Sequence, residues 1–146
     1  MVRDTSATRS SAPPIDAGEV EATIGRYRVL GVLGRGGMGV VYSGYDDLLR
    51  RRVAIKWINH RSLDAASRRR SLREAQAMAM LDHPNIVRVY EVLEVEAHLC
   101  IVMEFVPGRT LRRWLGETRP PRAEVLAALI QAGRGIAAAH AVGLVH

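Results

Sequence analysis

The sequence predicts an α+β fold, in which a five-stranded antiparallel sheet with one inserted helix is followed by further helices. Three observations support this prediction. Residues 27–58 hold three β-rich segments joined by tight turns, a helical pattern at 62–81 precedes two more β-rich segments, and residues 110–141 are again mostly helical. Short β-rich segments joined by tight turns indicate an antiparallel meander.

The first strands follow a different kind of segment. Residues 1–24 are rich in Ser, Thr, Ala and Pro and lack hydrophobic periodicity, so we expect a disordered tail. The pattern changes at Tyr27. From there we expect strands at 27–33, 40–45 and 51–58, with a glycine cluster at 34–39 and a turn at 46–50.

The inserted helix is expected at residues 62–81, which are rich in Ala, Arg, Leu and Met and contain no Gly or Pro. It should end before the helix-breaking sequence Asp82-His83-Pro84-Asn85. The last elements expected are strands at 86–93 and 98–106, a short helix at 110–116, and a longer helix at 122–141 with apolar residues at helical spacing.

Composition indicates a globular protein with one modest core. The chain has 146 residues, 48% of them hydrophobic and 25% charged. Cys100 is the only cysteine, which favours a reducing compartment. The N-terminus lacks the apolar core of a signal peptide, and the apolar run at 136–145 is too short to span a bilayer. We therefore expect a cytoplasmic protein with no membrane segment in this chain.

The charge is basic, but its distribution argues against nucleic acid as a partner. The formal net charge is +6, yet the arginines lie in small scattered groups with carboxylates between them. No aromatic residues interleave with them, as a single-strand-binding surface requires. Of the 21 basic residues, 20 are arginines, so the single lysine, Lys56, marks a position that favours a compact ammonium on a flexible stem.

The glycine cluster Gly34-Arg35-Gly36-Gly37-Met38-Gly39 fits the pattern G-x-G-x-x-G. Alone the pattern is ambiguous, because it also fits a dinucleotide-binding loop or a hairpin without a ligand. A dinucleotide-binding loop opens a helix, whereas Val40-Val41-Tyr42 is a β-branched run that prefers a strand. Glycines in such a loop let backbone N–H groups approach phosphate oxygens with no Cβ in the way.

The run Val53-Ala54-Ile55-Lys56 is the second motif. An apolar run that ends in lysine is also compatible with a strand whose last charge reaches solvent. Its position favours a binding role, because it begins one hairpin after the glycine cluster and ends on the only lysine of the chain.

In this order and spacing, the motifs resemble those of protein kinases, and the local sequence 34–42 is most similar to bacterial-type serine/threonine kinases. The resemblance extends from about Tyr27 to His146 and includes His83-Pro84-Asn85-Ile86-Val87 and residues 101–108. It implies a small lobe at 27–106, with the hinge exit and the first helices of an incomplete helical large lobe at 107–146.

The resemblance also implies an ATP site. Lys56 would contact the α- and β-phosphates and pair with Glu74, 18 residues further on, which we expect to share a sheet-facing side of the helix with Met78. An alternative is that Ser71 and Glu74 form a capping box, with a helix that starts at Ser71. The remaining residues implied at the cofactor are Leu33, Gly34, Arg35, Gly36, Gly37, Met38, Gly39, Val41, Ala54, the gatekeeper Met103, Glu104, Val106 and Thr110.

By the same resemblance, His146 begins the catalytic-loop motif H-R-D, at which the chain stops. The aspartate of that loop and the Mg²⁺ ligands are absent, so no metal ligand is assigned. We expect the ATP-binding half of a serine/threonine protein kinase that transfers the γ-phosphate of Mg-ATP to protein substrates, with little activity alone. The rival hypotheses are an inactive ATP-binding or interaction fragment, and a dinucleotide-dependent oxidoreductase, which needs a helix at 40–45.

Overall fold

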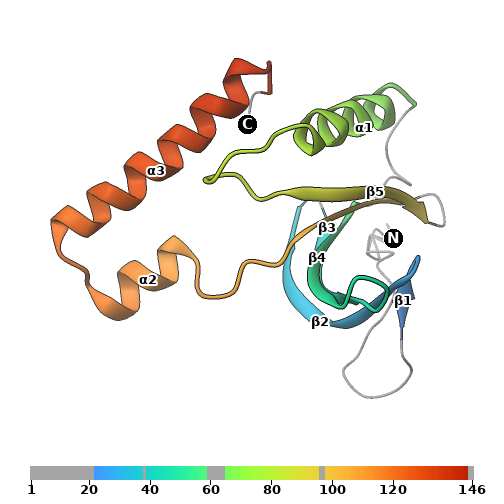
Figure 1. The fold of residues 1–146 in the computed structure, drawn as a ribbon, viewed down its shortest axis with the longest axis horizontal. Coiled ribbons are helices and arrows are strands. Elements are labelled where there is room, and N and C mark those ends of the chain that lie inside the picture. The colour runs from blue at the N-terminus through green and yellow to red at the C-terminus, as the bar shows by residue number, and fades with distance from the viewer. Residues whose placement is uncertain (1–21, 38, 59–64, 96–97, 145–146) are drawn as a thin grey trace, which may run out of the picture.

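Figure 1 shows the computed structural model, in which a curled sheet with one helix stands beside a pair of helices. The structure describes residues 22–37, 39–58, 65–95 and 98–144. In chain order its elements are β1 (Thr23–Ile24), β2 (Tyr27–Gly36), β3 (Gly39–Asp46), β4 (Arg51–Ile58), α1 (Ala65–Ala79), β5 (Val89–Val95), β6 (His98–Glu104), α2 (Leu111–Thr118) and α3 (Arg122–Ala141).

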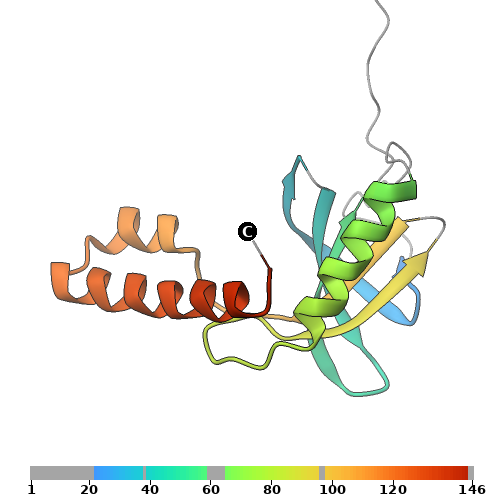
Figure 2. The same cartoon turned by 90° about the horizontal axis from the view of Figure 1, so that it is seen from above.

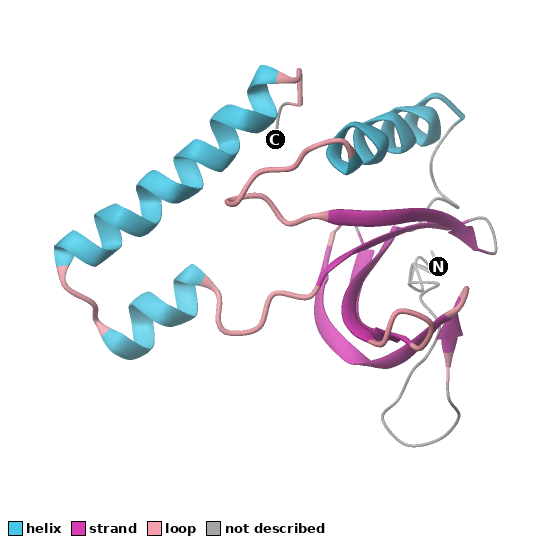
Figure 3. Ribbon diagram, in the orientation of Figure 1, coloured by secondary structure: helices cyan, strands magenta, loops and turns pink. Residues whose placement is uncertain are grey.

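The strands form one sheet in the order β1-β2-β3-β4-β6-β5, and each neighbouring pair is antiparallel. Figure 3 shows the strands gathered in one curled layer, with the helices outside it. The predicted α+β class and the antiparallel sheet with one inserted helix are therefore confirmed. The helix 122–141 also has the predicted bounds.

The predicted number of five strands is wrong, because β1 adds a sixth. Thr23 and Ile24 were expected in the N-terminal tail, but they form a strand. Ile24 is 1% exposed and belongs to the core, and Gly25 (φ +58°) makes the turn into β2. A two-residue strand shows no periodicity in sequence, since its place depends on backbone pairing and the burial of one side chain.

Other element boundaries shift by a few residues. The strand expected from residue 86 begins at Val89, because the Ile86 N–H donates to the His83 carbonyl (3.0 Å) and keeps the preceding residues in a turn. The short helix runs to Thr118 instead of Gly116. The first residues of the helix expected from 62 lie outside the described part of the chain, as do Met38 and His146.

The two faces of the sheet pack against different partners. One face is buried inside the curl, where the core consists of Ile24, Tyr27, Val40, Tyr42, Val53, Ile55, Trp57, Cys100 and Val102. The other face carries α1 (Figures 1 and 2). Beneath α1, Ala75 packs with Val89 and Ile101, and Met78 and Met103 join the edge of this cluster. One face of the sheet is therefore buried in the core, and the other face is only partly covered by α1.

Helices α2 and α3 follow the sheet. Thr110 caps α2, because its Oγ1 accepts a hydrogen bond from the Arg113 N–H (3.3 Å). Helix α3 contacts the turn between α1 and β5, where the Asn85 amide donates to Gln131 Oε1 (3.4 Å). No helix in the described part of the chain has both the length and the apolar character that a membrane crossing needs.

Candidate functional site

The glycine cluster forms a hairpin between two strands. Strand β2 continues to Gly36, which pairs with Gly39 at the start of β3. The segment 40–45 therefore continues as a strand, and the helix that a dinucleotide-binding loop requires is absent from this place. The oxidoreductase hypothesis is excluded on this ground.

The register of the central strands places the candidate residues on one face. Val41 lies opposite Lys56, and Ser43 lies opposite Ala54. On the other side of β4, Ala54 lies opposite Met103. Opposite residues of antiparallel strands point to the same side, so these side chains share the face that α1 partly covers. This face therefore carries four of the residues that the resemblance implies at the cofactor: Val41, Ala54, Lys56 and Met103.

A cavity of about 460 Å³ opens between the glycine hairpin and β4. This volume lies within the range of small-molecule sites. It is lined by Gly34, Arg35, Gly36, Gly37, Gly39, Val41 and Lys56. Two of these residues are cationic and none is acidic, so the cavity favours an anionic ligand.

The glycines of the hairpin differ in what surrounds them. At Gly34, Gly36 and Gly37, an added Cβ would meet no atom within 4 Å, so their backbone faces open space. A phosphate can approach such a backbone closely. Gly39 has φ +139°, and an added Cβ would lie 1.9 Å from the Trp57 carbonyl oxygen. The open backbone of the hairpin therefore leaves room for a ligand, and Gly39 fixes the contact of the hairpin with β4.

Lys56 and Glu74 are not brought together. Lys56 is half-buried and lines the cavity, whereas the Glu74 side chain is exposed on α1. Among the described residues, no ion pair joins them. Ala75, 1% exposed, faces the sheet in place of Glu74. The role of Glu74 stays a prediction.

The alternative role for Glu74 is contradicted by the helix itself. A capping box with Ser71 would start the helix at Ser71, but α1 begins at Ala65. Glu74 therefore lies in the interior of the helix, within its last three turns, where a side chain can reach a neighbouring element but cannot cap the helix start.

The residues that the resemblance implies around the adenine base differ in how far they are buried. Ala54 is 7% exposed and Met103 is half-buried. Leu33 and Val106 are 50% and 61% exposed. Two of the predicted residues have other contacts as well: the Glu104 N–H donates to the Arg88 carbonyl (2.9 Å), and Thr110 caps α2.

Arg52 lies on the same face of β4 as Ala54 and Lys56, and the sequence did not single it out. Its guanidinium lies 4.0 Å from the centre of the Phe105 ring and donates to Ser43 Oγ (3.1 Å). The alternation of β4 carried a signal, since Arg52 is four residues before Lys56 and falls on the same face. Its partners are distant in sequence and could not be read from it.

Two groups in the core, on the opposite face of the sheet, have raised pKa values. Burial raises the pKa of the Tyr42 hydroxyl, and the nearby Arg35 guanidinium partly opposes this shift. Burial also raises the pKa of the Cys100 thiol to about 12. Both groups therefore stay protonated at neutral pH. In the part of the chain that the structure describes, no three His, Cys, Asp or Glu side chains gather as a metal site would require.

A glycine hairpin that lies above a lysine on an antiparallel sheet, with a helix packed beside it, defines the nucleotide-binding lobe of a kinase. Residues 27–146 match the family described as protein kinase domain. The chain belongs to this family.

Several similar proteins are bacterial serine/threonine kinases. The chain is 42% identical over 123 residues to serine/threonine-protein kinase pkn2 of Myxococcus xanthus, covering 84% of this chain and 15% of pkn2. It is 42% identical over 125 residues to PrkC of Bacillus subtilis, covering 84% and 19%. The PknI kinase domain of Mycobacterium tuberculosis superposes with a TM-score of 0.74 at 30% identity, covering 89% of this chain and 54% of that one.

The predicted resemblance to bacterial-type serine/threonine kinases is thus confirmed. The chain spans less than a fifth of the length of pkn2 and of PrkC, and about half of the PknI kinase domain.

Proposed function

We propose that this chain is the ATP-binding half of a serine/threonine protein kinase that phosphorylates protein substrates. The observation that carries the proposal is the shared cavity of the glycine hairpin and Lys56, which combines open backbone with positive charge and no carboxylate. Membership of the protein kinase domain family supports the identity of the ligand.

In this proposal the hairpin and the lysine hold the phosphates. Backbone N–H groups of Gly34, Gly36 and Gly39 form the cradle, with Arg35 and Gly37 around it, and the Lys56 ammonium neutralises charge on the α- and β-phosphates. Met38, also implied at the cofactor, lies outside the described residues. ATP, when bound with Mg²⁺, supplies the phosphoryl group that is transferred. Since no metal site is present among the described residues, we assign no residue of this chain to Mg²⁺.

The base would lie along the exposed part of the same face. Leu33, Val41 and Ala54 cover its two sides, Met103 closes the inner end, and the backbones of Glu104 and Val106 meet the adenine edge. Thr110 lies next in the chain, near the ribose. The pairing of β4 with β6 supports this arrangement, because Ala54 and Met103 lie directly opposite each other on the same face of the sheet.

Glu74 is proposed to orient Lys56 in the active arrangement. For this, α1 has to turn about its axis so that Glu74 replaces Ala75 at the sheet. Ala75 packs with Val89 and Ile101 at this position, so the rotation has to replace these contacts.

Thermal stabilisation by ATP tests the proposal. Ligands that bind only the folded state raise its stability, so saturating ATP should raise the melting temperature of the unmodified chain. Lys56→Met should weaken ATP binding by roughly tenfold or more, because a charge-assisted contact contributes about 1.5–3 kcal/mol. Arg122→Met, which removes an exposed charge at the start of α3, is the matched control. Equal stabilisation of the unmodified chain and Lys56→Met would contradict the role of Lys56.

Phosphate transfer is a separate measurement. The chain is incubated with radiolabelled ATP, Mg²⁺ and a mixture of serine- and threonine-containing peptides, alone and as part of its full-length protein. Transfer only by the full-length protein is the expected result. Binding of ATP without transfer in either form would favour the inactive fragment over the kinase.

A further inference from the structure

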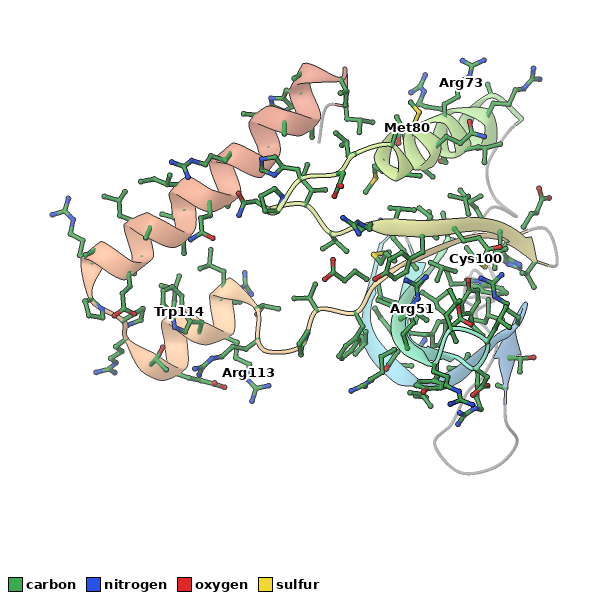
Figure 4. All side chains as sticks on the ribbon, viewed as in Figure 1. Arg51, Arg73, Met80, Cys100, Arg113 and Trp114 are labelled. Atoms are coloured by element: carbon green, nitrogen blue, oxygen red, sulfur yellow. The ribbon has the colours of Figure 1, made fainter. Side chains whose placement is uncertain are left out.

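Strand β4 begins with two arginines that point to opposite faces. Arg51 stacks on Tyr90, with its guanidinium carbon 3.5 Å from the ring centre. Arg52 stacks on Phe105 at 4.0 Å. Arg51 is labelled in Figure 4, within the curl of the sheet. Because neighbouring strand residues alternate, only Arg52 shares the face of Ala54 and Lys56.

Arg52 contacts two separate segments of the chain. Besides stacking on Phe105, it donates a hydrogen bond from Nη2 to Ser43 Oγ on β3 (3.1 Å). Ser43 is 5% exposed and lies opposite Ala54. A guanidinium is planar and carries several donors, so it can stack and donate at the same time. Arg52 therefore connects β3 with the chain that follows β6.

The connection lies where backbone pairing stops. The ladder between β4 and β6 ends at Val53 and Glu104, so Arg52 and Phe105 occupy the next position, where the side chains meet without a backbone pair. Residues 105–110 then belong to no helix or strand, and Val106 is 61% exposed. Within this stretch, Phe105 is half-buried, and its ring contacts Arg52 of the sheet.

We propose that Arg52 is a positioning residue for the adenine end of the nucleotide site. By holding Phe105, it fixes the following backbone at Val106 against the sheet, so that the backbone presents its polar groups to an adenine base. This inference rests on the proposed function, because the base is placed there by that proposal. Lysine cannot replace Arg52, since it lacks the planar group that covers the ring.

Hydrogen exchange tests the structural part in the absence of nucleotide. Arg52→Ala should speed amide exchange at Phe105 and Val106 by about two- to fivefold, the change expected from losing an exposed cation–π contact. Arg52→Lys should restore little of the protection. Arg51→Ala removes the neighbouring arginine and its stacking on the other face, and should leave these amides unchanged. Equal exchange in Arg52→Ala and the unmodified chain would overturn the inference.

Separate ligands test the adenine part. Arg52→Ala should weaken ADP binding by about two- to fivefold and leave the affinity for inorganic tripolyphosphate unchanged. A parallel loss for both ligands, or none for ADP, would overturn the inference. If the unmodified chain binds neither ligand, the proposed function itself fails, and the adenine role of Arg52 fails with it.

Discussion

Gly39 is the residue at which the glycine hairpin depends most on having no side chain. Its φ of +139° lies in a region that L-residues rarely adopt, and its Cα directly faces the Trp57 carbonyl. Gly37, at the tip of the same hairpin, has open space around it. The two glycines therefore serve different purposes: one permits contact with β4, and the other leaves room for a ligand.

Gly39→Ala should lower the free energy of unfolding by about 1–3 kcal/mol or more, because backbone strain adds to the clash with Trp57. Gly37→Ala is the matched control and should change stability by about 0.5 kcal/mol or less. Urea denaturation of both variants measures the difference. Equal stability of the two would show that the hairpin relaxes around an alanine at position 39.

Cys100 should make folding stability sensitive to alkaline pH. Burial raises its pKa to about 12 in the folded state, from an ordinary value of 9.0. The unfolded chain therefore loses this proton first as pH rises. The contribution of the protonated Cys100 thiol to folding stability is fully present below about pH 9 and is lost progressively toward pH 12.

We expect the melting temperature to fall as pH rises above about 9, and to fall less steeply in Cys100→Ala. The thiol should also resist alkylation in the folded protein and react after urea is added. Thermal melts from pH 7 to 11 measure the first effect. Parallel pH profiles of variant and unmodified chain would mean that other groups, such as the buried Tyr27, cause the decline.

Residues differ in how far their place was predictable. Lys56 was predictable, because its strand, its face and its distinct side chain are all local properties of the sequence. The orientation of Glu74 was not, since the rotation of α1 depends on the contacts of Ala75 with Val89 and Ile101. The partners of Arg52 were hidden for a similar reason, as stacking joins chain segments that are far apart.

At the scale of elements, α3 meets the turn between α1 and β5 through a glycine. Gly135 is the buried residue of α3, and an added Cβ would lie 2.6 Å from the Asn85 carbonyl oxygen. Asn85 also bonds to Gln131, one helical turn earlier. Gly133 lies on the same helix with nothing within 4 Å of an added Cβ.

This difference gives a paired prediction. Gly133→Ala should stabilise the chain by up to about 1 kcal/mol, because alanine favours a helix more than glycine. Gly135→Ala gains the same helix propensity but pushes α3 away from Asn85, so it should be destabilising and should deprotect the Asn85 region in hydrogen exchange. Stabilisation of both variants to the same extent would show that α3 does not rest on the turn.

Elements were predictable where their signals are local. The α3 bounds were predicted correctly, since its periodicity and the preceding prolines are contained in 25 residues or so. The β1 strand was missed because two residues give no pattern. The sequence pattern also did not predict that β6 lies between β4 and β5, since the order of strands depends on which strand edges pair in the folded sheet.

At the scale of the whole molecule, the helical part leaves apolar side chains uncovered. Leu126, Leu129, Ile130 and Ile136 of α3 are each about half exposed (56%, 50%, 47% and 52%). An apolar surface of this kind favours association with other surfaces. The sheet with α1, in contrast, has two buried clusters of its own.

We expect the isolated chain to self-associate through this face as its concentration rises. Leu129→Glu together with Ile130→Glu should shift the protein toward monomer, whereas the exposed Leu48→Glu change in the β3–β4 turn should not. Sedimentation velocity at several concentrations measures the distribution. A monomer at all concentrations would contradict the expectation.

The sheet and the helical part are joined at two described places: the chain at residues 105–110, and the contact of α3 with the Asn85 turn. Two points of attachment define a line. A rigid body held at two points can still turn about the line between them, while sliding and twisting in other directions are resisted. The described attachments therefore favour one swinging movement, which would widen or narrow the space between the two parts without breaking either join.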